Sequence, residues 1–550
     1  MNPIMKNFAF GAAFLLLGQV SVALGAPSAA QLKREAFAVV DTNADRMGRL
    51  NDAIFSYSEI GFQEVKTIAL VRKTLESAGF TVQTGVAGMP TAYMARYGSG
   101  SPVIGLMSDY DGIPGGSQKP TSLVHDPFVP GGPGHGEGHN THQPTLMGAA
   151  IAMKEIKDKF RLPGTIVVYG GPAEELVASR GYMTNAGLFK DIDALMDVHV
   201  SDKFGVTYGL NNFANVSVQW SFKGATAHSA GNPWRGRSAL DGVELMDAGV
   251  NAMREHGYNP DDARVHYVIP DGGKQPNVVP EQASVWYYIR AKSPELVQQI
   301  LDWTREIAQS AATETHTQVT ERILAGAWPF NGNEALARVV DKNIQLVGMP
   351  KWSADDVAFV RAYQTSMGAK VEGLPTKPEA LAADRQGSST SDAGDISWNV
   401  PYVRMWIPTR SSGALAGHHW SSAIGVATPV AHKGIAAGSK ALVASMIDLY
   451  TDPALLAGIK KDFAAQLARY PKWKSFIPAG ATPPTYLNVE EMATYRAALE
   501  KFEYDPESGK TYFEFLGLKY PPAVPSSALG KASNEPKPDK TASSLEWHWE

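Results

Sequence analysis

The stretch Val103-Ile104-Gly105-Leu106-Met107-Ser108-Asp109-Tyr110-Asp111 decides the fold, because a short apolar strand runs directly into two acids. Two more apolar runs, 165–169 and 194–198, are followed by Glu174-Glu175 and by His199. Helical patterns separate the runs, and strands that alternate with helices indicate a mostly parallel sheet covered by helices on both faces. Ligands of such sheets bind beyond the carboxyl ends of the strands, so we expect these acids and His199 to meet there.

Helices are expected on both sides of this core. Residues 31–57 have helical patterning, and Glu64–Ala78 forms an amphipathic pattern that stops at Gly79. Residues 146–160 also look helical, and a strand at 402–407 and a helix at 433–449 are expected late in the chain.

The pattern changes near residue 214. Val216, Val218, Trp220 and Phe222 alternate with polar residues, as in a half-exposed antiparallel strand. A helix over 238–256, a strand over 285–289 and a helix capped by Ser293 follow. We therefore predict a smaller α+β domain inserted into a larger α/β domain. The predicted division is a signal peptide over 1–25, a first segment of the larger domain over 31–212, the inserted domain over 213–325, a second segment of the larger domain over 326–460 and a C-terminal extension over 461–550 whose end is disordered.

Composition limits the function. The 550 residues carry a net charge of −5 without a Lys/Arg-rich run, so nucleic acid is not an expected partner. The chain has no cysteine, which excludes disulfides, thiolate catalysis and Cys-ligated zinc. Any metal ion must therefore be held by histidine and carboxylate.

The N-terminus has the features of a secretory signal. Lys6 precedes apolar residues 8–17 and 20–26, and Ala23-Leu24-Gly25 fits a cleavage site after Gly25. No other run is long and apolar enough to span a bilayer. We expect an exported protein, periplasmic or secreted, with no membrane partner.

A dense histidine cluster follows the long Gly/Pro-rich segment 112–134. It is Gly134-His135-Gly136-Glu137-Gly138-His139-Asn140-Thr141-His142, with three imidazoles and one carboxylate on a glycine-rich backbone. Ligands of this kind on a flexible backbone are typical of a metal site. A mobile surface loop that binds metal only by accident is the alternative.

Other residues could complete such a site. The side chains of Glu174 and Glu175 diverge, so one can bind a metal while the other acts as general base in amide hydrolysis. His199 is a candidate ligand or a core histidine, and Gly417-His418-His419-Trp420 is a second histidine cluster. A surface pair of glutamates is the alternative for Glu174 and Glu175.

Three candidates lie in the inserted domain. His228 should be far from the metal within one subunit, and so act only by domain closure or from a partner chain. Asn277 and Arg290 suit an anionic group of a substrate, Arg290 through a bidentate pair with a carboxylate. Both have an alternative interpretation as surface or packing residues.

Taken in order, these residues resemble the dinuclear metallo-amidohydrolase and exopeptidase family that includes aminoacylases, carboxypeptidase G and indole-acetyl amino acid hydrolases, and within it the branch of the p-aminobenzoyl-glutamate hydrolases. The motifs that carry the resemblance are Ser58-Glu59-Ile60-Gly61-Phe62-Gln63-Glu64, Asp109-Tyr110-Asp111-Gly112-Ile113-Pro114, Gly136-Glu137-Gly138-His139-Asn140, Pro172-Ala173-Glu174-Glu175, Asp197-Val198-His199, Gly224-Ala225-Thr226-Ala227-His228-Ser229, Ser391-Asp392-Ala393-Gly394-Asp395-Ile396-Ser397-Trp398 and Gly417-His418-His419-Trp420.

The resemblance implies a catalytic domain interrupted by a lid that also forms a homodimer or higher homo-oligomer. It implies two divalent ions, zinc or manganese with cobalt also credible, and Asp111 as a residue that supports the ligands. It assigns Glu174 as general base and acid, His228 as the group that polarises the scissile carbonyl from the partner subunit, and Asn277 and Arg290 as substrate contacts. The implied metal ligands are Glu137, His139, Glu175, His199 and His418.

One position departs from the family pattern. In this branch the position of Glu137 is normally cysteine, and here a harder, longer carboxylate replaces the thiolate. His135 and His142 are expected to be bystanders or to support the ligands. The implied activity is hydrolysis of an amide in N-acyl or N-aroyl amino acids, or in small peptide-like amides with a free carboxylate, by a metal-bound water. A dipeptidase or aminopeptidase, or a non-catalytic metal- or solute-binding protein, is the alternative.

Overall fold

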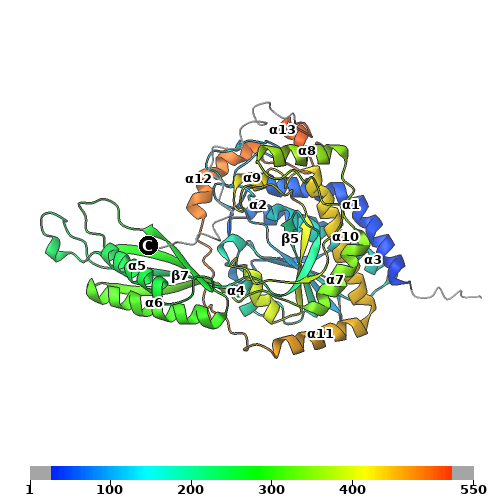
Figure 1. The fold of residues 1–550 in the computed structure, drawn as a ribbon. Coiled ribbons are helices and arrows are strands. Elements are labelled where there is room, and N and C mark those ends of the chain that lie inside the picture. The colour runs from blue at the N-terminus through cyan, green and yellow to red at the C-terminus, as the bar shows by residue number, and fades with distance from the viewer. Residues whose placement is uncertain (1–26, 523–550) are drawn as a thin grey trace, which may run out of the picture.

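A computed structural model describes residues 27–522 of the chain. A large α/β body carries a smaller α+β lobe on one side (Figure 1). The body is built on a nine-stranded sheet and the lobe on a four-stranded sheet. The predicted signal segment 1–25 and residues 523–550 of the predicted extension lie outside the described residues.

The body sheet is parallel in its middle and antiparallel at its flanks. Its strand order is β1-β2-β4-β3-β5-β13-β6-β11, and β12 pairs with β6. The four neighbours β4, β3, β5 and β13 run parallel, whereas β1, β2 and β11 pair antiparallel. The strands are β1 Thr81–Thr84, β2 Tyr93–Ser99, β3 Val103–Ser108, β4 Gly164–Gly170, β5 Ala194–Ser201, β6 Gly205–Leu210, β11 Asn331–Gly332, β12 Ala382–Ala383 and β13 Tyr402–Pro408.

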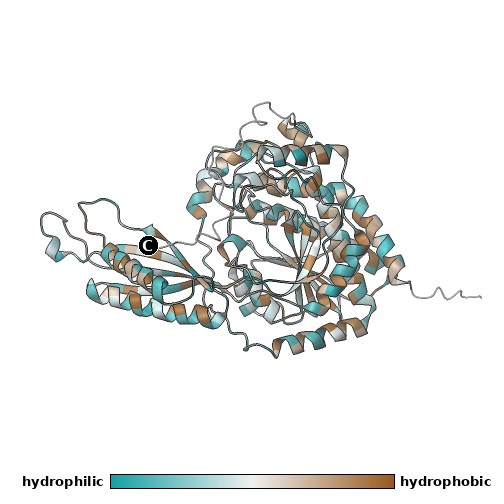
Figure 2. Ribbon diagram, in the orientation of Figure 1, coloured by the Kyte–Doolittle hydropathy of each residue, from teal (hydrophilic) through white to brown (hydrophobic). Residues whose placement is uncertain are grey.

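Burial explains why the middle strands are continuous apolar runs. Every residue of β4 is buried, as expected for a parallel strand covered on both faces. Ile166 and Val168 point into the core beneath one layer of helices. Val167 and Tyr169 alternate with them and point into a second core on the other face. In Figure 2 these central strands are predominantly hydrophobic, and the outer helices are mixed.

Helices cover both faces of the body sheet. One face packs against α1 Ala29–Tyr57, α2 Val65–Ser77, α3 His142–Phe160, α7 Glu334–Val347 and α10 Pro429–Thr451. The other face packs against α4 Arg180–Asn185 and the 3₁₀ segment η5 Asp392–Trp398. The remaining helices of the described body are α8 Ala354–Ser366, α9 Trp420–Ala423, α11 Pro453–Leu467, α12 Val489–Leu499 and α13 Tyr512–Leu516.

The lobe, called the lid domain here, spans residues 214–327. Its sheet has the order β10-β7-β9-β8, antiparallel throughout, and α5 and α6 cover one face only. The opposite face of the sheet is the open face. The elements are β7 Ala214–Lys223, α5 Ala239–His256, β8 Ala263–Asp271, β9 Gln282–Ala291, α6 Pro294–Glu314 and β10 Gln318–Ala327.

The predicted fold class, a helix-covered and mostly parallel sheet with a smaller α+β domain, is confirmed. Strand β8 was not expected; it is an edge strand whose alternation over residues 263–267 is interrupted by the exposed Val268 and Ile269. His199 does not end a strand as predicted, since β5 continues to Ser201. The helix expected from residue 146 begins at His142.

The C-terminal portion of the described chain packs on the body. The predicted boundary at 460 falls inside α11. Trp328 Nε1 donates to the carbonyl of Lys474 at 2.9 Å, and Asn488 Nδ2 donates to the carbonyl of Gly61 at 3.0 Å. Within residues 27–522 no single helix is long and apolar enough to cross a membrane, and α10 with α11 passes that test only as a pair bent by 100°.

Candidate metal centre and active site

The candidate residues gather at the carboxyl edge of the parallel strands. Asp109 and Asp111 follow β3, and Glu174 and Glu175 begin the 3₁₀ turn η3 (Glu174–Leu176) after β4. His418 lies in the loop after β13. Parallel neighbours end at the same edge of a sheet, which is why residues so distant in sequence come together.

Asp111 connects two of the predicted ligands. Its Oδ1 atom lies 3.2 Å from Nδ1 of His139, and its Oδ2 atom accepts the backbone N–H of Glu175 at 3.0 Å. A carboxylate on one ring nitrogen of a histidine fixes the ring and leaves the other nitrogen as the ligand atom. Asp111 thus contacts both His139 and the backbone of Glu175.

Two buried atoms at this point lack any partner. His139 Nε2 and Glu175 Oε1 are buried without a hydrogen bond, and they lie 4.0 Å apart. Buried polar atoms are normally hydrogen-bonded, so such a pair requires an explanation. A cation between an imidazole nitrogen and a carboxylate oxygen would satisfy both atoms.

His418 and Glu137 extend this group. His418 Nε2 lies 3.2 Å from Glu175 Oε2 and 3.9 Å from Glu137 Oε2. Its backbone is left-handed, with φ of 56°, which is unusual for a residue with a side chain. Glu137 Oε1 also lies 3.9 Å from Nη1 of Arg410. Glu137, His139, Glu175 and His418 thus form one chain of contacts.

His199 faces the same group from β5. Its ring centroid is 5.5 Å from that of His139 and 5.1 Å from that of His142. Burial, with further contributions from His142 and Arg404, holds the pKa of His199 well below its ordinary range. His199 is therefore a neutral imidazole, the form that binds metal.

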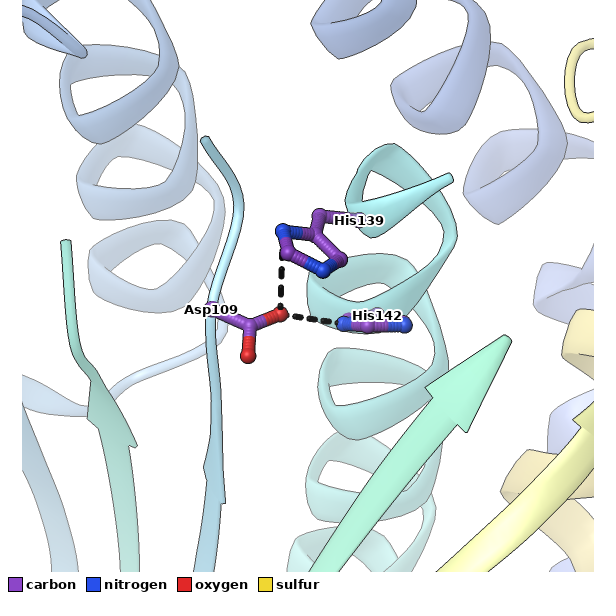
Figure 3. Close-up of side chains that lie close together, drawn as sticks. All are labelled: Asp109, His139 and His142. Carbon is purple, nitrogen blue, oxygen red and sulfur yellow. Dashed lines mark hydrogen bonds and ion pairs between the residues drawn. The ribbon is translucent and has the colours of Figure 1, made fainter. Parts of the chain in front are cut away.

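Among residues 27–522, one group of three side chains brings potential ligand atoms within 4.8 Å of one another: Asp109, His139 and His142 (Figure 3). His142 Nδ1 is 2.5 Å from Asp109 Oδ1, and its Nε2 accepts the N–H of Val200 at 2.9 Å. Asp109 Oδ2 also accepts a hydrogen bond from Arg180 at 2.5 Å. Asp109 and His142 are thus already bonded, and His139 Nε2 is the available ligand atom of the three.

The residues present fit a divalent metal. The donors are imidazole nitrogens and carboxylate oxygens, a mixture that suits zinc and manganese. Burial alone would lower the pKa of His139, but Asp109 and Asp111 raise it well above its ordinary value. The carboxylates around His139 therefore favour a positive charge at this point. A metal cation bound to the unpartnered Nε2 of His139 would supply that charge.

Glu174 points away from this group, as the divergence of the two glutamates predicts. Ser391 Oγ donates to Glu174 Oε1 at 2.8 Å, and Arg404 Nη2 donates to Ser391 Oγ at 3.1 Å. Arg404 in turn pairs with Asp197 at 2.8 Å. Burial, reinforced by Asp109 and Asp392, raises the pKa of Glu174 to about 7.

The turn that presents the two glutamates has a demanding backbone. Ala173 and Val177, on either side of η3, have positive φ angles of 54° and 56°. Gly61 packs against this turn, and a Cβ atom there would come within 2.9 Å of Ala173 Cβ. Strained residues of this kind cluster at functional sites.

Sequence reasoning missed a buried ion-pair network beneath the site. Arg180 is fully buried, and its guanidinium bonds to Asp109 and to Asp392 Oδ1, the latter at 2.9 Å. Asp392 and Ser391 stand in a motif that contributes to the family resemblance, but the sequence indicated no role for either residue. Arg180 and Arg404 lie in no motif, and nothing in their surroundings in sequence marks them.

The three lid candidates do not lie together. His228 is exposed, and its Nδ1 accepts the N–H groups of Ala230 and Gly231, both at 3.1 Å. Asn277 is its neighbour, since the carbonyl of Asn277 accepts the N–H of Ser229 at 3.1 Å. Arg290 is elsewhere, on the open face of the sheet, stacked 5.3 Å from the ring of Tyr288.

Arg290 lies close to the turn that carries Glu174 and Glu175 in its own chain. Tyr288 Oη donates to the carbonyl of Leu176, the residue after Glu175, at 3.2 Å. Burial lowers the pKa of Arg290, and Tyr288 and Glu174 oppose that shift. Arg290 therefore lies within the electrostatic range of Glu174, whereas His228 and Asn277 share the distal loops of the lid.

Comparison with known proteins identifies relatives that cover most of the chain. The model of peptidase family M20/M25/M40 matches residues 105–524. The B subunit of the p-aminobenzoyl-glutamate hydrolase of Escherichia coli is 32% identical over 471 residues, 81% of this chain and 97% of that protein. The Xaa-Arg dipeptidase of Mus musculus is 25% identical over 460 residues, covering 80% of this chain and 95% of the dipeptidase.

A solved structure shares the fold. The aminobenzoyl-glutamate utilization protein from Klebsiella pneumoniae superposes with a TM-score of 0.51 at 16% identity, and covers 74% of this chain and 97% of that one. At this identity the likeness concerns the fold alone.

Proposed function

Because this chain belongs to peptidase family M20/M25/M40 and is a metallo-amidohydrolase, we propose that it hydrolyses the amide of N-acyl or N-aroyl amino acids, or of small peptide-like amides with a free carboxylate. One observation carries the proposal: Glu174, a buried carboxyl group with a pKa raised to about 7, shares the turn η3 with Glu175, whose unpartnered Oε1 lies 4.0 Å from the unpartnered Nε2 of His139. A base with that pKa next to a cation site is suited to proton transfer in hydrolysis at neutral pH.

Relatives support this substrate class. One relative belongs to a hydrolase of p-aminobenzoyl-glutamate, an aroyl amino acid, and another is a dipeptidase. An aroyl amino acid and a dipeptide both contain an amide bond next to a residue with a free carboxylate. The shared chemistry is therefore a better guide to this chain than the precise acyl group of either relative.

The metal centre is proposed to hold two divalent ions. Glu137, His139, Glu175, His199 and His418 would hold them, with zinc or manganese expected and cobalt also suitable. Bound divalent ions supply Lewis acidity, which lowers the pKa of water and polarises an amide carbonyl. The contacts that connect Glu137, His139, Glu175 and His418 support this assignment.

Glu174 is the group that moves the proton. Its carboxylate accepts a proton from the attacking water and delivers it to the leaving amine nitrogen. Ser391 holds Oε1 of Glu174, so Oε2 remains available for that exchange. Arg404, which donates to Ser391, keeps the serine hydroxyl turned towards the glutamate.

The substrate contacts are proposed to come from two subunits. Arg290 binds the free carboxylate within its own subunit, in keeping with its proximity to Glu174. His228 and Asn277 are exposed on the distal loops of the lid, where they can reach the site of another copy. A homodimer through the lid, with His228 polarising the scissile carbonyl across the interface, follows from this arrangement.

The protein is proposed to act after export, in the periplasm or outside the cell. Support comes from the sequence of residues 1–25 and from the absence of cysteine. A fusion of residues 1–30 to a reporter that is active only after export tests this, and retention of the reporter in the cytoplasm would contradict it.

A dipeptidase activity is the second candidate, supported by the relationship to the Xaa-Arg dipeptidase. A non-catalytic binding protein is disfavoured, because binding a metal needs no second carboxylate held as Glu174 is. The test is a hydrolysis assay of purified, metal-reconstituted protein on N-acyl amino acids and dipeptides. Release of amino acid only with metal supports the proposal. No release from any compound by fully loaded protein would favour the binding protein.

A further inference from the structure

The open face of the lid sheet carries an aromatic pocket. Neither the predicted metal ligands nor Glu174 lines this pocket. The pocket has a volume of about 250 Å³ and is lined by His266, Tyr267, Val268, Trp286, Tyr288 and Arg290. That volume is below the range of about 300–1,000 Å³ for drug-sized ligands, so it suits a single ring or one side chain.

The walls of the pocket are held in place by side-chain contacts. Trp286 Nε1 donates to Ser217 Oγ at 2.7 Å. Tyr288 lies edge-on to Trp286, with ring centroids 5.8 Å apart, and to His266, with centroids 5.7 Å apart. An aromatic ring of a ligand would find edges and faces in the arrangement that aromatic pairs prefer.

One end of the pocket adjoins the turn η3, which carries Glu174 and Glu175. Arg290 and Tyr288 line the pocket, and Tyr288 Oη donates to the carbonyl of Leu176 within η3. A ligand that starts in the pocket and passes Arg290 therefore arrives at the turn that carries Glu174 and Glu175.

Asn215 provides an independent sign of a ligand. It pairs directly with Arg290 across β7 and β9, so both side chains lie on the open face. Asn215 is 0% exposed, and neither its Nδ2 nor its Oδ1 has a hydrogen-bond partner. Arg290 Nε is also buried and unpartnered, and Arg290 forms no ion pair among the residues that the structure describes. A buried amide without a partner, next to a half-buried guanidinium whose Nε is unpartnered, favours an anionic, hydrogen-bonding ligand at this point.

We infer that this face of the lid is a substrate subsite in which Arg290 and Asn215 bind a carboxylate while Trp286 and Tyr288 bind an aromatic ring of the same molecule. The ligand class is a compound with a carboxylate and a single aromatic ring. The ring can belong either to the acyl group or to the amino acid that is released, and steady-state kinetics separates these two. The assignment of the ring to one side of the scissile amide rests on the proposed function, because it requires hydrolysis. The binding of the ring and the carboxylate does not.

Binding is tested first without metal, so that a carboxylate cannot be held by bound ions. The probe is 4-fluorobenzoate, observed by fluorine NMR with the full chain, and trifluoroacetate is the ringless control. We expect broadening of the 4-fluorobenzoate signal and little broadening of the control. Trp286→Ala should weaken binding of the probe about tenfold. Equal binding of both probes, or an unchanged affinity in Trp286→Ala, would overturn the inference.

Asn215→Leu separates recognition from folding. Leucine has a similar size and removes an amide that has no partner, so the melting temperature should stay the same or rise. The affinity for 4-fluorobenzoate should nevertheless fall about fivefold or more, as expected for loss of a hydrogen bond to a charged ligand. Ser221→Ala, on the same strand away from Arg290, is the matched control. Unchanged affinity in Asn215→Leu would show that the amide does not contribute to the subsite.

Kinetics then places the ring. The metal-loaded enzyme is assayed with N-acetylglycine, N-acetylphenylalanine and N-benzoylglycine. Trp286→Ala should raise KM about tenfold for the compound whose ring occupies the pocket, and leave its kcat and both constants for N-acetylglycine unchanged. An increase for N-benzoylglycine assigns the acyl side, and one for N-acetylphenylalanine assigns the released side. If the three KM values change equally, the subsite is excluded. If the wild type hydrolyses nothing but binds 4-fluorobenzoate through Trp286, the proposed function fails and the subsite stands.

Discussion

Ser391 Oγ donates a hydrogen bond to Oε1 of Glu174 at 2.8 Å, and so joins the segment before β13 to the turn after β4. A hydroxyl donor stabilises the ionised form of a carboxyl group. Ser391 is therefore a positioning residue that also favours the proton-accepting state of Glu174.

Ser391→Ala should lower kcat by about tenfold with a small change in KM, because a hydrogen bond to a charged group is worth about 1.5–3 kcal/mol. Loss of the donor also raises the pKa of Glu174, so the acid side of the pH–rate profile should move to higher pH. Steady-state kinetics from pH 5 to pH 9 measures both effects. Ser389→Ala, an exposed neighbour two residues away, is the control. A lower rate with an unmoved profile would mean that Ser391 has only a structural role.

The rate should increase with pH as Glu174 loses its proton. Burial and the nearby acids Asp109 and Asp392 raise the pKa of Glu174 to about 7, and the base must be ionised to accept a proton. Bound cations favour the ionised form, so half-maximal kcat/KM is expected at or below about pH 7. A profile that is flat from pH 5 to pH 8 would exclude Glu174 as the rate-determining base.

Glu64 should make the metal-free protein less stable as the pH rises. Burial, with a contribution from Asp111, raises the pKa of Glu64 from 4.5 to about 8. Between these values the folded protein keeps a proton that the unfolded chain has lost, so this contribution is fully present below pH 4.5 and disappears as the pH passes 8.

The isosteric variant Glu64→Gln tests this. Oε1 of the glutamine can still accept the N–H of Ala173, as Oε1 of Glu64 does at 2.9 Å, directly before the turn η3. Unfolding free energies are measured with urea between pH 5 and pH 8. Their decrease with pH should be less steep in Glu64→Gln than in the wild type, by the slope that corresponds to about one bound proton. An identical pH dependence in both proteins would mean that Glu64 does not hold this extra proton in the folded state.

Glu137 should determine how much metal the protein holds. Its carboxylate lies 3.9 Å from His418 Nε2, the same nitrogen that lies 3.2 Å from Glu175 Oε2. Glu137→Ala is expected to reduce bound zinc or manganese from two ions to about one per chain, because it removes one of the five proposed ligands. Elemental analysis after dialysis measures this, with Glu155→Ala on the surface of α3 as the control. Two ions in Glu137→Ala would mean that this carboxylate is not a ligand.

The elements that the sequence could predict are those dictated by local pattern. Apolar runs such as 165–169 identified the central strands because parallel strands are buried on both faces. The edge strand β8 could not be found, because its exposed Val268 and Ile269 break the alternation on which such a prediction depends. His199 was placed too near a strand end because β5 continues for two more residues.

The supporting residues of the site were beyond sequence reasoning. Arg180 and Arg404 act through distant acids, Asp109 and Asp197, and only the packing of the sheet brings those pairs together. Asn215 has no feature in the sequence that separates it from any polar strand residue. Its significance comes from burial without a partner, which is a property of the folded chain alone.

The central claim is that Glu174 transfers the proton in a metal-dependent amide hydrolysis. The most direct measurement compares Glu174→Gln with the wild type, in both metal content and hydrolysis of an N-acyl amino acid. Because Glu174 points to Ser391 and not to the ligand group, we predict equal metal content and a loss of kcat of at least about 100-fold. A Glu174→Gln enzyme as active as the wild type, with the same metal content, would contradict the account.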